Sequence, residues 1–527
     1  MIATMATPVL AALVVIFISY HFFLYPAFLS PLAKIPNAHW SAPYSRLWAL
    51  HIRFTKRENR TLLEAHKRLG PVVRVAPNEL TIDDVDCVRT VYSGGFDKPV
   101  WYSVFDNYGV TCMFSARQSK DHAIRKRMIS NVYSKSYIHT STAASHQAQT
   151  ILFGRLLPAI QASTTGPRPH GIDVHSLFLA TTMDFISCYV FGLHNGTNFI
   201  QQSGFRDHWL ELYKSRNDYG FYDQELPWLT RLCRMVGIPL CPSFVDYANG
   251  ELENWLRDIV AQTLPSQPTW SDVPQDQKPV VMAALVDGHS KNPSLLSNSG
   301  PKHYLDTLSS ELLDHVLAGQ ETAGVTLTYL TWRISQDLSL QHKLLQELLF
   351  LSPTLKFTPN TNTTSPSLPD PKLLDSLPLL HAVVTETLRL HAPIPGAQPR
   401  ETPSQGCSLD GYEVPGGVRV AAMAYTLHRD ENVFPEAEVW DYTRWLPGYA
   451  SEEEMKARKR AFWAFSSGGR MCVGSNFAMH EMKLIVAAIY SNYTSYIVDD
   501  DGLAEQSDGY TSRPAKERLY LRFDKVE

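Results

Sequence analysis

The chain has 527 residues, of which 44% are hydrophobic and 19% charged, and its formal net charge is −4. This composition is typical of a globular protein, and no basic stripe interleaved with aromatic residues indicates nucleic-acid binding. The seven cysteines include no C-x-x-C pair, which argues against a zinc ribbon or a thioredoxin-like redox site. Their odd number and wide spacing also argue against a disulfide framework and favour a reducing compartment for the main body.

The N-terminal segment PVLAALVVIFISYHFFLYPAFL, residues 8–29, contains no charged residue. As a helix rising ~1.5 Å per residue it spans about 33 Å, close to the ~30 Å hydrocarbon core of a bilayer. A cleaved signal peptide is the alternative, but the first 33 residues hold no Lys or Arg, whereas Lys34, Arg46 and Arg53 follow the span. Because cationic flanks tend to stay on the cytosolic side, we predict an uncleaved anchor with a cytosolic catalytic body.

The hydrophobic pattern of the rest of the chain predicts mainly helix. Strand-like patterns are short and fall in two places, residues 71–83 and 417–428, and no internal repeat is visible. We therefore predict a mainly α fold with a minor β part. The predicted organisation is an anchor over 1–29, a proline-rich hinge over 30–40 and one catalytic domain over 41–527.

Three helices carry the residues of interest: 303–337, 373–391, and one that begins at or just after Cys472. The first keeps apolar residues at helical spacing and contains the stretch A-G-Q-E-T, residues 318–322. Gly319 costs a helix interior up to about 1 kcal/mol relative to alanine, and Thr322 can bond back to a carbonyl one turn earlier. Taken alone, this stretch favours an ordinary flexible helix.

Two further stretches bring charges together. Glu386 and Arg389, in E-T-L-R, lie three residues apart on one helix face and can form an ion pair, although such pairs are usually solvated. The stretch DHAIRKRMIS, residues 121–130, holds three consecutive cations that taken alone read as surface residues.

Cys472 stands in the stretch FSSGGRMCVG, residues 465–474, at the mouth of the last predicted helix. A helix N-terminus offers unpaired N–H groups and a partial positive charge, and both stabilise a thiolate. The flanking glycines let a large flat group approach the backbone, and Arg470 can pair with a carboxylate. These features fit a flat metal complex with an acidic rim, whereas the alternative is a buried free cysteine near a turn.

The whole stretch resembles the haem-binding loop of the cytochromes P-450, because Phe465, Gly468, Arg470, Cys472 and Gly474 occupy the fixed positions of that loop. The resemblance extends over roughly residues 30–525 and is strongest to microsomal, filamentous-fungal members. It implies that Cys472 is the axial ligand of the iron of haem b, that Phe465 packs beside it, and that Arg470 binds a haem propionate.

The resemblance also implies roles for residues upstream of the loop. Glu386 and Arg389 would form a buried structural triad with Arg444, which lies in FPEAEVWDYTRW, residues 434–445. Glu321 and Thr322 would relay protons to dioxygen, with Ala323 where many members have a second Thr or Ser.

The haem carboxylates have several candidate partners. The family's W-x-x-x-R is replaced here by His122 and Lys126, and the neighbouring Arg125 and Arg127 leave the contacting cation open. Arg400 is expected to bind the other propionate.

The implied function is a haem-thiolate monooxygenase that inserts one oxygen atom of O2 into an apolar small molecule, in fungal secondary-metabolite biosynthesis. Electrons are expected from NADPH through a separate flavoprotein reductase, and the basic run 456–460 is either its docking site or plain solvated surface. The expected location is the endoplasmic reticulum membrane, single-pass, with no nucleic-acid partner. The alternatives are a haem-thiolate desaturase, isomerase or dehydratase, and a non-catalytic membrane-tethered haem-binding protein.

Overall fold

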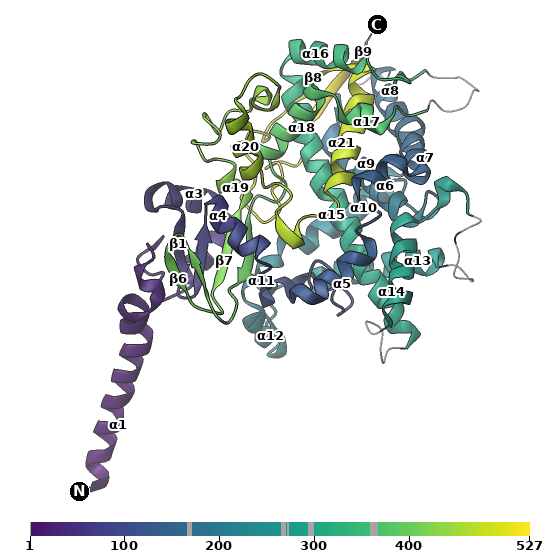
Figure 1. Cartoon of the computed structure of the whole chain (residues 1–527). Helices are drawn as coiled ribbons and strands as arrows, with labels where there is room; N and C mark the ends of the chain where they lie inside the picture. The colour runs from purple at the N-terminus through teal and green to yellow at the C-terminus, as the bar shows by residue number, and fades with distance from the viewer. Residues whose placement is uncertain are drawn as a thin grey trace.

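The computed structural model describes residues 2–526 apart from 166–170, 265–269, 271–272, 294–299 and 359–366. In Figure 1 a helix-rich body and a smaller sheet region lie side by side, and α1 (Ile2–Ser19) extends away from the sheet region. The prediction of a mainly α fold with a minor β part is confirmed.

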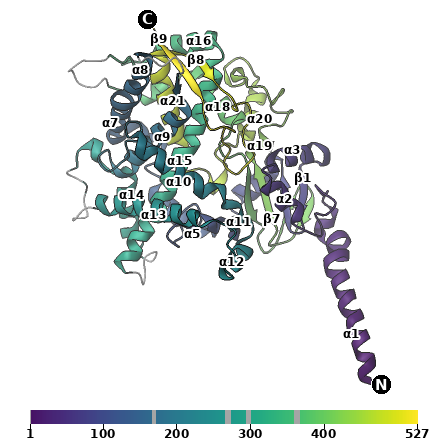
Figure 2. The same cartoon turned by 180° about the vertical axis from the view of Figure 1, so that it is seen from behind.

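The longer helices form the body of the molecule. They are α5 (Ser119–Ile129), α7 (Thr142–Ile151), α8 (Leu157–Thr165), α9 (Val174–Phe191), α10 (Ser203–Asp218), α13 (Ser243–Thr263), α14 (Val280–Lys291), α15 (Pro301–Ser335), α16 (Leu338–Leu348), α18 (Pro378–Leu390) and α21 (Ser475–Tyr490). Other helices connect them or cover the sheet region: α2 (Leu47–Phe54), α3 (Glu58–Leu69), α4 (Val85–Val88), α6 (Lys135–Thr140), α11 (Gly220–Glu225), α12 (Pro227–Met235), α17 (Pro371–Asp375), α19 (Ala424–Leu427) and α20 (Glu452–Ala461). Seen from behind in Figure 2, α15 runs through the middle of the body, and it packs along α9.

The predicted helix over 303–337 is confirmed as α15, whose Leu308, Leu312 and Val316 are buried. The predicted helix over 373–391 is two helices, α17 and α18, because Pro378 begins α18 and cannot donate a hydrogen bond to a preceding turn. The last predicted helix is α21, which begins three residues after Cys472.

The main sheet has four strands in the order β1-β2-β7-β4. β1 (Val72–Ala76) and β2 (Glu79–Ile82) confirm the strand pattern predicted over 71–83. β7 (Arg419–Met423) accounts for only the first half of the pattern over 417–428, since the chain turns into α19 at Ala424. β4 (Ala397–Glu401) pairs antiparallel with β7, so that Arg400 lies opposite Val420.

Two smaller sheets complete the β part. β9 (Tyr520–Lys525) lies between β3 (Ile172–Asp173) and β8 (Tyr493–Asp499), and β5 (Cys407–Leu409) pairs with β6 (Tyr412–Val414).

The apolar N-terminal span is helical as predicted, because α1 continues as a π-helix over Tyr20–Leu29. Residues Leu10–Leu29 are long and apolar enough to cross a membrane and none of that window is buried, so this segment is a candidate membrane anchor. Val174–Phe191 passes the same test of length and composition, but 89% of it is buried, as expected of a core helix. Pro26 lies inside the helical span, and its carbonyl accepts a hydrogen bond of 2.7 Å from Arg74 Nη1 on β1.

Glycines allow α15 to approach α9 closely. A Cβ added at Gly319 would lie 2.6 Å from Ile186 Cγ1, and one added at Gly324 would lie 2.7 Å from Leu179 Cδ2 and 3.1 Å from its Cα. Both positions therefore exclude larger residues, which explains why a helix interior tolerates the intrinsic cost of glycine.

A buried ion network joins the sheet region to its covering helices. Arg53 on α2 forms ion pairs with Glu79, with Glu58 at 2.8 Å and with Glu225 at 3.1 Å, and Arg419 lies 3.3 Å from Glu79. Burial alone would raise the pKa of Glu79, but Arg419 and Arg53 outweigh it and lower that pKa to about 2. Since Glu225 ends α11, the network also fixes the segment that leads into α12.

We expect Gly324→Ala to destabilise the fold by about 1–3 kcal/mol, because the added methyl group meets the side chain and backbone of Leu179 on α9. The measurement is the midpoint of urea unfolding. The matched control is Gly250→Ala on α13, where a Cβ meets no atom within 4 Å and the change should leave stability unchanged or raise it. Equal destabilisation by both changes would contradict this account of the packing.

The network predicts a pH-dependent effect of Glu79→Gln. The pKa of Glu79 falls from an ordinary glutamate value of 4.5 to about 2 in the folded protein. Its carboxylate therefore contributes stability above pH 4.5, about 3 kcal/mol, and loses it as the pH falls towards 2. Urea unfolding of wild type and variant should differ most at pH 7 and converge in acid. A difference that does not change with pH would show that Glu79 acts through packing instead.

Candidate active site

The loop around Cys472 is folded tightly upon itself. The Cys472 backbone N–H donates to the Phe465 carbonyl at 2.9 Å, and the Trp463 indole N–H donates to Ser467 Oγ at 2.9 Å. Gly468 has φ +71°, and a Cβ there would lie 2.2 Å from the Tyr92 carbonyl oxygen, so only glycine fits. The loop is thereby fixed to the sheet side of the molecule and presents Cys472 to the interior.

Among the cysteines in the described part of the chain, Cys472 is the one classed as exposed, and it lines an interior cavity. Burial of the surrounding site raises its pKa, while backbone N–H groups of Gly474 and Ser475 and the charge of Lys126 act in the opposite direction. Gly474 is the N-cap of α21, so these N–H groups are the unpaired donors of a helix N-terminus. A negatively charged sulfur therefore has three nearby sources of stabilisation.

A mainly apolar cavity of about 220 Å³ opens in front of the thiol. Residues of the Cys472 loop line one side, and Ala318, Gly319, Thr322 and Ala323 of α15 line the other. Further walls come from separate parts of the chain: Met113, Phe114, Tyr133, Ile186, Ile394, Phe477 and Tyr510. The exposed thiol thus faces α15 across a slot with apolar walls.

Cations gather at one end of this cavity. Lys98, His122, Arg400 and Arg470 all line it. Burial lowers the pKa of Lys98 well below its usual range, and Arg400 and Arg470 lower it further, which shows that the three cations lie close together. Burial and the same cations lower the pKa of His122 to about 3, so the imidazole is neutral.

The protein itself leaves these cations short of negative charge. The Arg470 guanidinium donates to the carbonyls of Ala116 and Arg117 at 2.6 Å each, and its Nε has no hydrogen-bond partner among the described residues. Its nearest carboxylate is Asp97, at 4.0 Å and half exposed. A ligand with carboxylates at one edge would satisfy this cluster.

Haem fits the donor set that the cavity offers. Its carboxylates match the cations, its flat body matches the apolar slot, and its iron matches the sulfur of Cys472.

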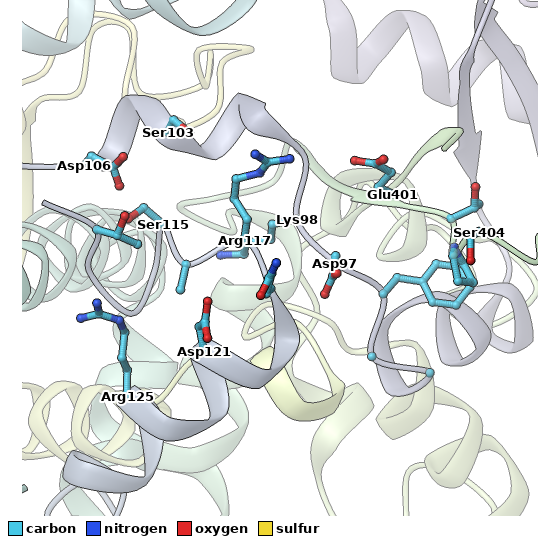
Figure 3. A pocket seen from close by; sticks show the side chains of 18 of the residues that line it. Asp97, Lys98, Ser103, Asp106, Ser115, Arg117, Asp121, Arg125, Glu401 and Ser404 are labelled. Atoms are coloured by element: carbon cyan, nitrogen blue, oxygen red, sulfur yellow. The ribbon is translucent and has the colours of Figure 1, made fainter. Parts of the chain in front are cut away.

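A larger pocket of about 890 Å³ lies outside this cavity and shares Lys98 with it. Figure 3 shows that its walls carry charges of both signs: Asp121 and Arg125 rise from α5, Asp97 lies beside Lys98, and Glu401 comes from the end of β4. No residue of the Cys472 loop lines it. We therefore assign the chemistry to the smaller apolar cavity, with Lys98 at the boundary between the two.

The three consecutive cations of α5 take different positions. Lys126 Nζ donates to the carbonyls of Gly469 and Met471, at 2.9 and 3.3 Å, and thus supports the Cys472 loop from outside the cavity. Arg125 lies 3.6 Å from Glu311 on α15, and Arg127 donates to the Ala123 carbonyl. His122 is the residue of this stretch that lines the cavity.

On α15 the two residues predicted to relay protons face different surroundings. Thr322 lines the cavity, and its hydroxyl donates to the Ala318 carbonyl at 2.8 Å. Glu321 is buried against other helices, where it accepts a hydrogen bond of 2.8 Å from the Tyr213 hydroxyl and pairs with Arg513. The carboxylate is thus held by a cation that lies 192 residues further along the chain.

Glu386, Arg389 and Arg444 are buried and lie together, and none of them lines the cavity. Arg389 binds Glu386 through two bonds of 2.9 and 2.7 Å, and Arg444 Nε lies 3.5 Å from Glu386 Oε1. Trp445 Nε1 and the Asp441 N–H also donate to the same carboxylate, at 2.8 and 2.9 Å. All four oxygen lone-pair directions are therefore used, as a fully buried carboxylate requires.

Sequence reasoning missed three residues of this region. Lys98 stands in no motif, and Arg513 lies near the C-terminus with no local signal that it pairs with α15. Asp314 lines the cavity two turns before Thr322, and its i, i+4, i+8 spacing with Ala318 and Thr322 was visible in the sequence.

Comparison with known proteins finds one matching family and several fungal relatives. Residues 45–517 match the family described as Cytochrome P450. The chain is 25% identical over 477 residues to "Cytochrome P450 monooxygenase orf2" of Aspergillus niger, covering 88% of this chain and 86% of the relative. It is 27% identical over 439 residues to "Cytochrome P450 monooxygenase avaI" of Aspergillus versicolor, covering 80% and 95%. It is 24% identical over 517 residues to "Cytochrome P450 monooxygenase FGM1" of Gibberella zeae, covering 97% and 95%.

We expect Glu386→Gln to destabilise the protein by about 3–5 kcal/mol, because it leaves Arg389 buried without its counter-charge. Urea unfolding followed by tryptophan fluorescence measures the effect. Glu438→Gln is the matched control, since Glu438 also pairs with an arginine, Arg429, but is 65% exposed and should change stability by less than about 1 kcal/mol. Equal stability of Glu386→Gln and wild type would contradict the structural role.

Proposed function

The chain belongs to the cytochrome P450 family, and on this premise we propose that it is a membrane-anchored monooxygenase in which the Cys472 sulfur would bind the iron of haem. The observation that carries the proposal is that one cavity is lined by the exposed Cys472 thiol, by the uncompensated cations Lys98, Arg400 and Arg470, and by Thr322 of α15. Each of these features fits a different part of the same cofactor.

The chain's own residues would hold the haem at three points. The Cys472 sulfur would bind the iron, and the N–H groups at the start of α21 would stabilise its negative charge. Arg470, Arg400, Lys98 and the neutral His122 would bind the two propionates, so that the cofactor would bring the negative charge that the cavity lacks. Lys126 is proposed to hold the loop carbonyls rather than the haem.

When bound, the haem would supply the reductive activation of O2, with one oxygen atom going to the substrate and the other to water. The Thr322 hydroxyl is proposed to deliver a proton into the cavity, because Thr322 lines the cavity and rotation about its χ1 would release the hydroxyl from the Ala318 carbonyl. Glu321 can supply that proton only after it loosens its bond to Arg513, so we propose that this ion pair limits proton entry.

The substrate is proposed to be a mainly apolar small molecule, because the walls above the Cys472 loop are aliphatic and aromatic. The named relatives are all fungal monooxygenases, which supports a place in fungal secondary-metabolite biosynthesis. A desaturase, isomerase or dehydratase would use the same cavity. Retention of Glu321 and Thr322 supports oxygen insertion.

Electrons are proposed to come from NADPH through a separate flavoprotein reductase at the endoplasmic reticulum membrane, with the candidate anchor holding the enzyme on the cytosolic side. The basic run on α20 is only partly free to dock such a partner. Arg458 is buried and donates to the Arg444 carbonyl, and Arg460 pairs with Asp86, whereas Lys456 and Lys459 are exposed. Docking through α20 would therefore depend on the two lysines.

The test is the carbon monoxide difference spectrum of the reduced protein in microsomes, for wild type and Cys472→Ser. We expect wild type to give the red-shifted Soret band of thiolate-ligated haem and the variant to lose it, since serine offers no soft sulfur ligand. Cys407→Ser is the matched control, because Cys407 is partly buried on β5 and lies outside the cavity.

If the haem-loaded wild type lacked that band, the result would contradict the proposal that Cys472 binds the iron. Product formed with NADPH and a reductase would eliminate the non-catalytic haem-binding alternative.

A further inference from the structure

Asp314 is a carboxylate of the cavity that the proposed chemistry does not use. It lies on the face of α15 that also carries Ala318 and Thr322, one and two turns further along, and it lines the cavity with them. The cavity walls near it, from Met113, Phe114 and Ile186, are apolar. A carboxylate in such surroundings is costly unless something compensates its charge.

No described residue provides that compensation by direct contact. In the part of the chain that the structure describes, Asp314 has no ion pair within 4 Å and no hydrogen bond, whereas Glu311, one turn earlier, accepts from the Met113 N–H at 2.8 Å. Burial and the neighbouring Glu311 raise the pKa of Asp314 to about 7, and Lys98 and Arg216 only partly oppose them.

The two cations that oppose the raised pKa of Asp314, Lys98 and Arg216, make their direct contacts with other groups. The Lys98 ammonium donates to the Phe114 carbonyl and lies 4.1 Å and 3.9 Å from the ring centres of Tyr102 and Phe114. Arg216 donates to Asn107 Oδ1 at 2.8 Å.

The charges at the haem end balance without Asp314. Arg400 and Arg470 carry two positive charges, and the two propionates of the proposed haem would carry two negative ones, while burial lowers the pKa of Lys98 well below its usual range. Two carboxylates line the cavity, Asp314 on α15 and Glu481 on α21. Of these, Asp314 is the one on the helix face that also carries Thr322, and among the described residues it has no ion pair within 4 Å.

We propose that Asp314 binds a protonated nitrogen of the substrate, so that the substrate class is an apolar molecule with one basic amine. This inference rests on the proposed function and names the substrate of the same site. Asp314 and Thr322 are eight residues apart, about 12 Å along the helix axis. An amine held at Asp314 therefore directs oxidation to the opposite end of the molecule, not to the carbon next to the nitrogen.

The test compares two probes of nearly equal shape, N,N-dimethyl-4-phenylbutylamine and its carbon isostere 5-methylhexylbenzene. Binding to the full-length holoprotein in nanodiscs is measured at pH 7 by equilibrium dialysis against protein-free nanodiscs. We expect wild type to bind the amine about 10- to 100-fold more tightly than the isostere, the range of one charge-assisted hydrogen bond. Asp314→Asn should reduce this ratio to about one.

Glu311→Gln is the matched control, because it removes a carboxylate one turn away that does not line the cavity. It should keep the preference for the amine. Asp314→Ser is a second variant in case the amide impairs folding, and haem content and the carbon monoxide spectrum of each sample report whether the fold and the proposed thiolate ligation are intact.

Two outcomes would overturn the proposal: equal binding of both probes by wild type, or a preference that survives in both Asp314 variants, as direct coordination of the amine to iron would produce. Because dialysis does not depend on turnover, a failure of the monooxygenase proposal would appear in the carbon monoxide spectrum and not in the binding ratio.

Discussion

The arrangement of the site depends on a charge imbalance within the protein. Lys98, Arg400 and Arg470 line one largely buried cavity, and among the described residues the one carboxylate within 4 Å of them is the half-exposed Asp97. Because like charges in a low dielectric repel strongly, an anionic ligand between them would stabilise this arrangement. The Cys472 loop belongs to the same constraint, because Arg470 lies two residues before Cys472 and so joins the cation cluster to the loop.

Buried charges elsewhere in the molecule are arranged differently. Glu386 has every oxygen satisfied by Arg389, Trp445, Asp441 and Arg444, and Glu79 lies between Arg53 and Arg419. The carboxylates of these groups are paired within the protein, and the pairs hold elements together. The cation cluster and Asp314 lack such close partners of opposite charge among the described residues. This difference distinguishes charged groups that stabilise the fold from charged groups that are available to bind a ligand.

α15 joins these functions in one element. Its Gly319 and Gly324 bring it against α9, its Thr322 and Asp314 face the cavity, and its Glu321 points to Arg513 and Tyr213. Because consecutive residues on a helix lie 100° apart, neighbours such as Glu321 and Thr322 must face different surroundings. The close packing against α9 fixes the rotation of α15, and so decides which of its polar residues the substrate meets.

The sequence by itself determined the features that depend on local spacing. The ten residues around Cys472 form a loop at a helix start, Glu386 and Arg389 meet on one helix face, and an uncharged span begins the chain, because each needs only residues close in sequence. The tertiary structure decided which distant residues join them. Lys98 shares the cavity with His122 while Lys126 supports the loop from outside, Arg513 reaches Glu321 across 192 residues, and Asp314 is left unpaired among the described residues. These outcomes depend on how helices rotate and pack against one another, and a side chain's partner across the core is set by that packing and not by its neighbours in sequence.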